Sequence, residues 1–262
     1  MKKLLTLAAF CVALSASAQA AVILKAVTYK DGDTALKGYI AYDDRMKDKR
    51  PGILVVHEWW GLTQHTRDYA RYLASKGYTA LAVDMYGKVA DEPKAAGELM
   101  KGVMGTPEVM RSRFEAAKAV LASHPTVDAK RLGAVGFSMG GPIVLTMARM
   151  GDDLAGVVSV YGNLETKNPA KAGVTKSRVL VIHADGDPFV KPEAIPAFKK
   201  EMEAAKVNYS FVTYAGVKHG FANPEATVSG RKFDMPIAYN AEADRKAKAE
   251  VVKFFSGIFD KR

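Results

Sequence analysis

The sequence is short of cysteine. Its 262 residues include a single one, Cys11. Residues 21–262 therefore hold no cysteine, which excludes both disulfide bonds and a thiol nucleophile from that part of the chain. A chain of this length can bury a core large enough to be stable without disulfides. Any nucleophile used in covalent catalysis must therefore be a hydroxyl or another non-thiol group.

Long apolar runs are also scarce. The one at residues 4–14 is too short to span a bilayer, follows two lysines, and leads to a small-x-small sequence that ends at Ala20. This pattern predicts a secretory signal peptide at residues 1–20, cleaved after Ala20. We therefore expect residues 21–262 to form a single domain that is periplasmic or secreted, with no stable membrane insertion once the signal is removed.

The chain has no basic block. Lys and Arg total 38 against 28 Asp and Glu, for a net charge of +10, and the basic residues are spread along the sequence without an interleaved aromatic array. Nucleic-acid-binding proteins usually gather such residues on one face. We therefore expect no nucleic-acid partner.

Apolar runs alternate with segments of helical spacing. Residues 22–29 and 35–42 predict two antiparallel strands joined by an Asp-Gly turn. Later runs are continuously apolar, which is typical of strands covered on both faces; they are residues 53–56, 78–83, 132–137, 156–161, 179–183 and 209–214. The alternation predicts an α/β fold with a mostly parallel central sheet and helices on both faces.

The predicted helices lie between these runs and at the end of the chain. Thr63 is a candidate cap for a helix that reaches Lys76, and the last helix carries an apolar stripe that includes Val251 and Phe255. Residues 84–107 and 218–240 are less regular, and we expect them to shape the mouth of a pocket. Ligands of such folds bind at the carboxyl ends of the strands.

A Gly-x-Ser-x-Gly sequence follows the strand predicted at residues 132–137. Gly136 and Gly140 flank Ser138, and glycine at these positions allows a sharp strand-to-helix turn that lifts the serine hydroxyl clear of the sheet. The alternative is an ordinary tight turn with close helix packing. The surrounding strand and helix favour Ser138 as a catalytic nucleophile.

A serine nucleophile needs a base and an acid that orients the base. His219 follows the last predicted strand and is the best candidate base, although a single loop histidine is usually just exposed. Asp187 follows the preceding strand and is the preferred acid, with Asp185 in reserve and Glu165 as a third choice. The order serine, acid, histidine is that of α/β-hydrolases.

The loop after residues 53–56 offers a place for the oxyanion. The backbone N–H groups of Trp59 and Met139 are the candidate donors. Trp60 is equally consistent with a core or lid aromatic and with a substrate contact. Glu58 directly follows a buried strand, where a carboxylate is costly unless it is paired, so we expect it to have a defined partner near the site.

Together these motifs resemble the dienelactone hydrolase family over most of residues 21–262. The matching pieces are His57-Glu58-Trp59-Trp60-Gly61, Asp84-Met85-Tyr86-Gly87, the turn around Ser138, Asp185-Gly186-Asp187-Pro188-Phe189-Val190, and His219-Gly220-Phe221. The resemblance implies a compact α/β-hydrolase without a large cap domain. It also implies Asp187 as the acid and Glu58 as the acidic residue that contacts the resting nucleophile.

The sequence departs from that family in three respects. Members that open dienelactone use a cysteine nucleophile, where this chain has Ser138. Their glutamate helps to activate that thiol. Beside a serine, the roles that remain for Glu58 are to order the loop or to hold the hydroxyl. Their two arginines that bind the substrate carboxylate correspond to Lys88 and Asn223. Lysine can still offer a substrate one charge but not the planar guanidinium fork, and asparagine offers no charge.

The sequence therefore predicts a serine hydrolase that cleaves a small-molecule carboxylic ester or lactone, without a metal or cofactor. A peptidase or amidase on the same fold is the nearest alternative. A binding protein that keeps the pocket without the chemistry is the other.

Overall fold

The structure is a computed structural model that describes residues 22–260. The predicted signal peptide and its cleavage after Ala20 lie outside the described residues. The strands are β1 (Val22–Asp31), β2 (Thr34–Asp43), β3 (Arg50–Val56), β4 (Thr79–Val83), β5 (Val127–Phe137), β6 (Gly156–Val160), β7 (Arg178–Ala184) and β8 (Tyr209–Tyr214). The helices are α1 (Gln64–Ala74), α2 (Pro93–Met104), α3 (Pro107–Ser123), α4 (Gly140–Arg149), α5 (Ala194–Ala204), α6 (Ala226–Lys232) and α7 (Ala241–Phe259).

Within these residues the strands form one sheet in the order β1-β2-β4-β3-β5-β6-β7-β8. The β1–β2 hairpin and the β2–β4 pair are antiparallel, and every pair from β4 to β8 is parallel. All residues of β3, β4 and β6 are buried, as expected for apolar strands covered on both faces. The predicted mostly parallel sheet is confirmed.

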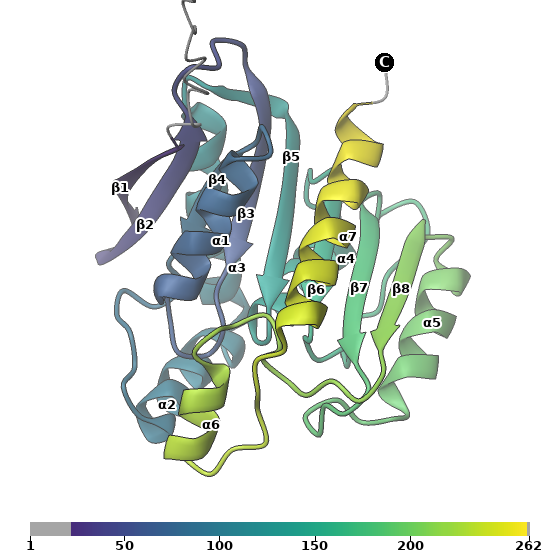
Figure 1. Cartoon of the computed structure of the whole chain (residues 1–262). Helices are drawn as coiled ribbons and strands as arrows, with labels where there is room; N and C mark the ends of the chain where they lie inside the picture. The colour runs from purple at the N-terminus through teal and green to yellow at the C-terminus, as the bar shows by residue number, and fades with distance from the viewer. Residues whose placement is uncertain (1–21, 261–262) are drawn as a thin grey trace, which may run out of the picture.

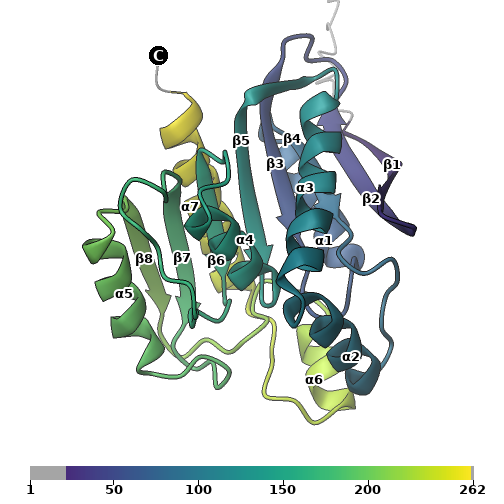
Figure 2. The ribbon, with the colours of Figure 1, turned by 180° about the vertical axis from the view of Figure 1, so that it is seen from behind.

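Helices cover both faces of this sheet. In Figure 1, α1 and α7 lie in front of the strands, while α3, α4 and α5 cover the opposite face, which Figure 2 shows from behind. Two buried apolar clusters correspond to the two layers: Phe114 and Phe198 lie in one, Leu73 and Phe255 in the other. Each helix thus buries one apolar stripe against the sheet.

Two helices lie in segments that we expected to be less regular. Residues 84–107 contain α2, and residues 218–240 contain the short α6. Gly97 and Gly102 lower the helix propensity of α2, and α6 is only seven residues long, so neither helix was recognised from the sequence. Figures 1 and 2 both show α2 and α6 side by side beyond the carboxyl ends of the central strands. The two helices therefore stand where ligands of this kind of sheet bind.

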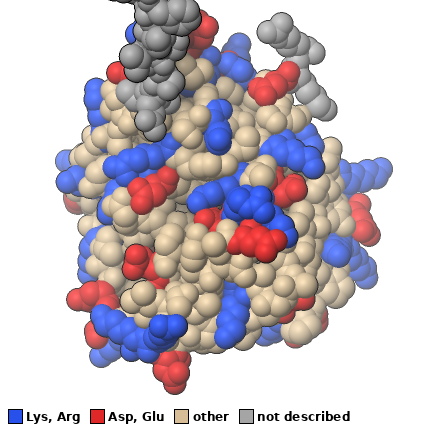
Figure 3. Space-filling view, viewed as in Figure 1, with Lys and Arg blue, Asp and Glu red and all other residues tan. Residues whose placement is uncertain are grey.

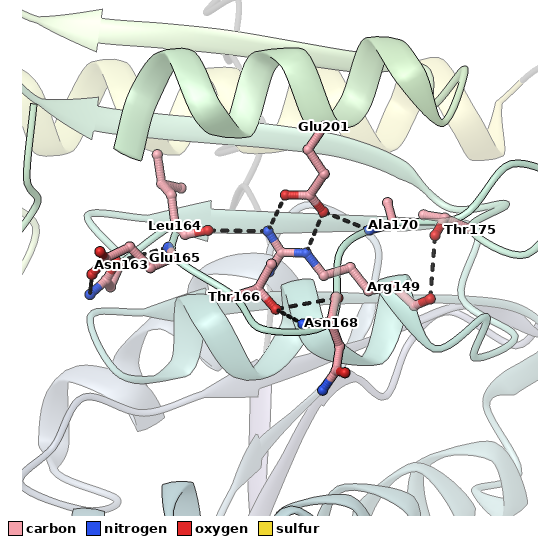
Figure 4. A network of polar contacts seen from close by, with 9 residues as sticks. All are labelled: Arg149, Asn163, Leu164, Glu165, Thr166, Asn168, Ala170, Thr175 and Glu201. Atoms are coloured by element: carbon pink, nitrogen blue, oxygen red, sulfur yellow. Dashed lines mark hydrogen bonds and ion pairs between the residues drawn. The ribbon is translucent and has the colours of Figure 1, made fainter. Parts of the chain in front are cut away.

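A buried ion pair joins α4, the helix that follows Ser138, to α5. The same two side chains also hydrogen-bond to the loop after β6. Arg149, at the end of α4, donates through Nε and Nη2 to the carboxylate of Glu201 on α5, over 2.8 and 2.9 Å (Figure 4). Arg149 also donates to the Leu164 carbonyl, and Glu201 accepts from the Ala170 N–H. The loop that carries Asn163 is thereby held between the two helices.

We expect Arg149→Ala to destabilise the protein by about 3–5 kcal/mol, because it leaves the buried Glu201 carboxylate without its partner. This corresponds to a fall in Tm of roughly 10 °C for a chain of this size. The measurement is thermal unfolding followed by circular dichroism. The control is Arg131→Ala, whose ion pair with Asp128 is partly exposed and worth less than about 1 kcal/mol. Equal effects of the two substitutions would contradict a stabilising role for the Arg149–Glu201 pair.

The surface is mixed in charge. On the face seen in Figure 3, Lys and Arg side chains are interspersed with acidic and uncharged residues and form no continuous block. No helix within residues 22–260 is both long enough and apolar enough to cross a membrane.

Candidate active site

Ser138 stands on a sharp turn between β5 and α4. Its φ of 50° lies in the left-handed region, which is strained for a residue with a side chain. The turn is close-packed: a Cβ on Gly136 would collide with the Gly140 carbonyl, and one on Gly140 would lie 2.5 Å from the Val56 carbonyl oxygen. The two glycines are therefore required by packing, as the sequence pattern predicted.

The structure brings Ser138, His219 and Asp187 into one line of contacts. The Ser138 Oγ lies 2.8 Å from Nε2 of His219, and Nδ1 of His219 lies 2.7 Å from Oδ2 of Asp187. These residues are 81 and 32 positions apart in the chain. They meet because each follows a different strand at the same edge of the sheet.

The surroundings of Asp187 hold its carboxylate in place. Its side chain is fully buried, and its Oδ1 accepts the Phe189 N–H over 2.8 Å, which leaves Oδ2 for the imidazole. The two other candidate acids lie elsewhere. Asp185 is exposed and accepts the Gly216 N–H, and Glu165 forms an exposed ion pair with Lys191. Of the three carboxylates, only that of Asp187 contacts His219.

Two backbone N–H groups border the same space. Trp59, in the loop after β3, and Met139, at the start of α4, both line the pocket beside Ser138. Within residues 22–260 neither N–H has a hydrogen-bond acceptor. Unpaired donors beside a nucleophile are what an oxyanion hole requires.

Glu58 is buried, and both of its carboxylate oxygens accept hydrogen bonds. Its Oε1 accepts the Tyr161 hydroxyl over 3.1 Å, and its Oε2 accepts the Asn223 side-chain amide over 2.5 Å. Nδ1 of His65 lies 3.7 Å from Oε2, too far for a hydrogen bond but close enough for attraction to a protonated imidazole. The expectation of a defined partner for Glu58 is met by three.

These partners set the charge of the carboxylate. Burial alone would raise the pKa of Glu58, but His65, His219 and Asn223 outweigh burial, so the pKa is lowered and the carboxylate is ionised. Burial also raises the pKa of Tyr161 well above its ordinary value, and Glu58 adds to the effect. Tyr161 is therefore a neutral donor to a buried anion.

The sequence analysis missed Tyr161 and His65. Tyr161 directly follows β6 and has a φ of 41°, so it occupies a strained position beside that of Ser138. His65 is 8% exposed, and neither of its ring nitrogens has a hydrogen-bond partner within residues 22–260. The one signal available in the sequence was the position of Tyr161 at a strand end.

The pocket has a volume of about 560 Å³, in the range of small-molecule sites. Trp60 lines it and is also buried, with its ring 5.6 Å from that of Phe233, so its side chain lies between the pocket and a buried apolar cluster. Asn223 lines the pocket as well, but Lys88 does not. Lys88 is exposed.

No group of three or more His, Cys, Asp or Glu side chains in the described part of the chain is arranged to hold a metal ion. The residues around Ser138 thus offer acid–base and hydrogen-bonding groups. The chemistry available to them is nucleophilic attack assisted by proton transfer.

The mostly parallel sheet, the strained serine turn and the donors at the strand ends define an α/β-hydrolase. The model of the dienelactone hydrolase family matches residues 36–259, and the chain belongs to this family. Its membership makes the chain a carboxylic ester hydrolase, so this part of the sequence prediction is confirmed. Within residues 22–260 there is no large cap domain.

Known proteins agree with this assignment. A putative carboxymethylenebutenolidase from Aquifex aeolicus is 27% identical over 206 residues, which are 75% of this chain and 86% of that protein. The structure resembles a dienelactone hydrolase-like promiscuous phosphotriesterase from metagenomic libraries, with a TM-score of 0.85, 32% identity, and coverage of 92% of this chain and 100% of the other. A putative dienelactone hydrolase from Klebsiella pneumoniae shares the fold at 21% identity and a TM-score of 0.73, with coverage of 90% and 99%.

Proposed function

We propose that this protein hydrolyses a carboxylic ester or lactone through a Ser138–His219–Asp187 triad and an acyl-enzyme. Nε2 of His219 accepts the hydroxyl proton as the Ser138 Oγ attacks the carbonyl carbon. The same nitrogen then gives the proton to the departing alkoxide oxygen, which leaves as an alcohol or, in a lactone, stays attached to the acyl group. Water, activated by His219, breaks the acyl-enzyme and regenerates the serine.

The observation that carries the proposal is the unbroken chain of contacts from Ser138 through His219 to Asp187. Asp187 orients the imidazole and stabilises its protonated form. The Trp59 and Met139 N–H groups are placed to stabilise the oxyanion. Glu58 is not needed as a base, since it is already occupied by Tyr161 and Asn223; its role is to hold the loop that presents Trp59.

The proposal includes export to the periplasm or the exterior, with residues 1–20 removed. Its support is the sequence alone: two lysines, a short apolar run and a small-x-small site before residue 21. The partner is a small-molecule ester or lactone, with no nucleic acid and no stable membrane insertion of the processed chain.

A fluorophosphonate probe tests the triad. Its phosphorus is attacked by an activated serine, so we expect a single covalent adduct, with loss of fluoride, at Ser138 of the folded protein. Peptide mapping by mass spectrometry locates the adduct. His219→Ala should slow labelling strongly, because the serine loses its base, and heat-unfolded protein should not react. An adduct on another serine, or none, would contradict the triad.

A further inference from the structure

The wall of the pocket offers no positive charge to a substrate. None of the described residues that line it is lysine or arginine, and the wall includes the ionised carboxylate of Glu58. A substrate carboxylate that entered would lose its hydration without gaining a cation. The cost of burying such an unpaired charge is large.

The two positions that correspond to the family's carboxylate-binding arginines cannot supply the missing interaction. Lys88 lies outside the pocket. Asn223 does line it, but both ends of its amide are occupied: Nδ2 donates to Glu58, and Oδ1 accepts the Glu225 N–H over 3.0 Å. Asn223 therefore holds the protein's own carboxylate in the place where an arginine would receive that of a substrate.

Glu58 itself opposes a second negative charge. It is enclosed and ionised, and it lines the same pocket as Ser138. Like charges brought together in a site of low effective dielectric repel each other by several kcal/mol. The pocket therefore has no cation to attract a substrate carboxylate, and Glu58 repels one.

The rest of the wall suits an apolar group. Met100 and Met104 of α2 face the pocket from one segment, Met235 and Ile237 from another, and Phe189 lies beside His219 with ring centroids 4.9 Å apart. Methionine side chains adapt to irregular apolar ligands. A volume of about 560 Å³ leaves room for an extended chain or a ring next to the reacting carbonyl.

We propose that the substrate is a neutral ester or lactone with an extended apolar group, and that the pocket discriminates against substrates that carry a carboxylate. This inference rests on the proposed function, because it places the reacting carbonyl at Ser138. The residues that line the pocket thus determine the substrate class. By this preference the protein differs from enzymes that bind an anionic lactone.

Three aryl esters of matched length test the proposal: p-nitrophenyl valerate, mono-p-nitrophenyl glutarate, and the methyl ester of the latter. The glutarate ester carries a carboxylate at the end of its acyl chain, and the methyl ester removes that charge while keeping the polar atoms. We expect kcat/KM to be at least about a hundredfold lower for the glutarate ester than for the valerate ester. The methyl ester should regain most of that loss.

The variant Met104→Lys places a cation in the wall, with Met104→Gln as a neutral polar control. Met104 takes no part in the proposed chemistry, and it lies in the last turn of α2, where a lysine is tolerated. We expect Met104→Lys to raise kcat/KM for the glutarate ester at least about tenfold relative to Met104→Gln. Circular dichroism reports whether each variant is folded.

Comparable rates for the valerate and glutarate esters, or a preference for the glutarate ester, would overturn the substrate class and leave the ester hydrolase standing. Failure to hydrolyse any of the three esters, together with no fluorophosphonate adduct, would overturn the proposed triad and this inference with it. A gain for Met104→Gln equal to that for Met104→Lys would show that polarity, not charge, sets the selectivity, and would also overturn the proposal.

Discussion

Replacement of Ser138 by alanine is expected to lower kcat for ester hydrolysis by about 10⁶-fold, because triad residues act as one unit and the nucleophile starts the reaction. The fold should persist, since alanine keeps the Cβ and loses one partly buried hydrogen bond to His219. The measurement is hydrolysis of p-nitrophenyl valerate under single-turnover and steady-state conditions, with circular dichroism to confirm folding.

The matched control for this prediction is Ser210→Ala on β8. Ser210 is exposed and lies near the amino end of β8, whereas the candidate site lies beyond the carboxyl ends of the strands, so its hydroxyl should make no difference to turnover. Residual activity of Ser138→Ala within tenfold of the unmodified protein would contradict a serine nucleophile. It would point to a route in which His219 activates water directly.

The second large effect is expected for Asp187→Asn, which should lower kcat by about 10⁴-fold. The asparagine keeps the shape of the side chain, but its amide favours the wrong tautomer of His219 and cannot stabilise the protonated imidazole. The buried position of Asp187 makes this effect large, because no water replaces the lost charge. The measurement is kcat and its pH dependence with the valerate ester.

Asp185→Asn is the control for that substitution, since Asp185 lies two residues away and accepts the Gly216 N–H instead of an imidazole proton. An asparagine oxygen can accept the same bond, so we expect kcat to change less than about threefold. If Asp185→Asn lost as much activity as Asp187→Asn, the assignment of the acid would be wrong.

Much of the fold was predictable because strands covered on both faces must be apolar throughout. Residues 53–56 and 179–183 were recognisable for that reason, and each lies within a strand of the sheet. The helices α2 and α6 were not predicted as helices. Two glycines lower the helix propensity of α2, and the seven residues of α6 are too few to show a helical period.

The candidate site was predictable where a backbone turn accepts only certain types of residue. Gly136 and Gly140 identify the turn that presents Ser138, because nothing larger fits there. The contacts of Glu58 were not predictable in the same way. Tyr161 is 103 positions away, and its hydroxyl reaches the carboxylate only because β6 ends beside β5. A contact between residues so far apart produces no characteristic spacing that can be recognised in a single sequence.

The position of the Lys88 side chain also could not be predicted from the sequence. Its resemblance to a carboxylate-binding position concerned the order of residues, whereas in the structure Lys88 is exposed and is not among the residues that line the pocket. A motif can preserve the path of the backbone while the side chain it carries no longer reaches the substrate.

The pocket draws its reactive groups and its walls from different parts of the chain. Ser138 and Asp187 follow strands of the central sheet, whereas Met100, Met104 and Ile237 come from segments outside it. Substitutions in α2 or in residues 218–240 can therefore alter which molecules are accepted while the bond-breaking groups stay fixed. A hydrolase built in this way can acquire new substrates by small steps in evolution, each of which leaves a working enzyme.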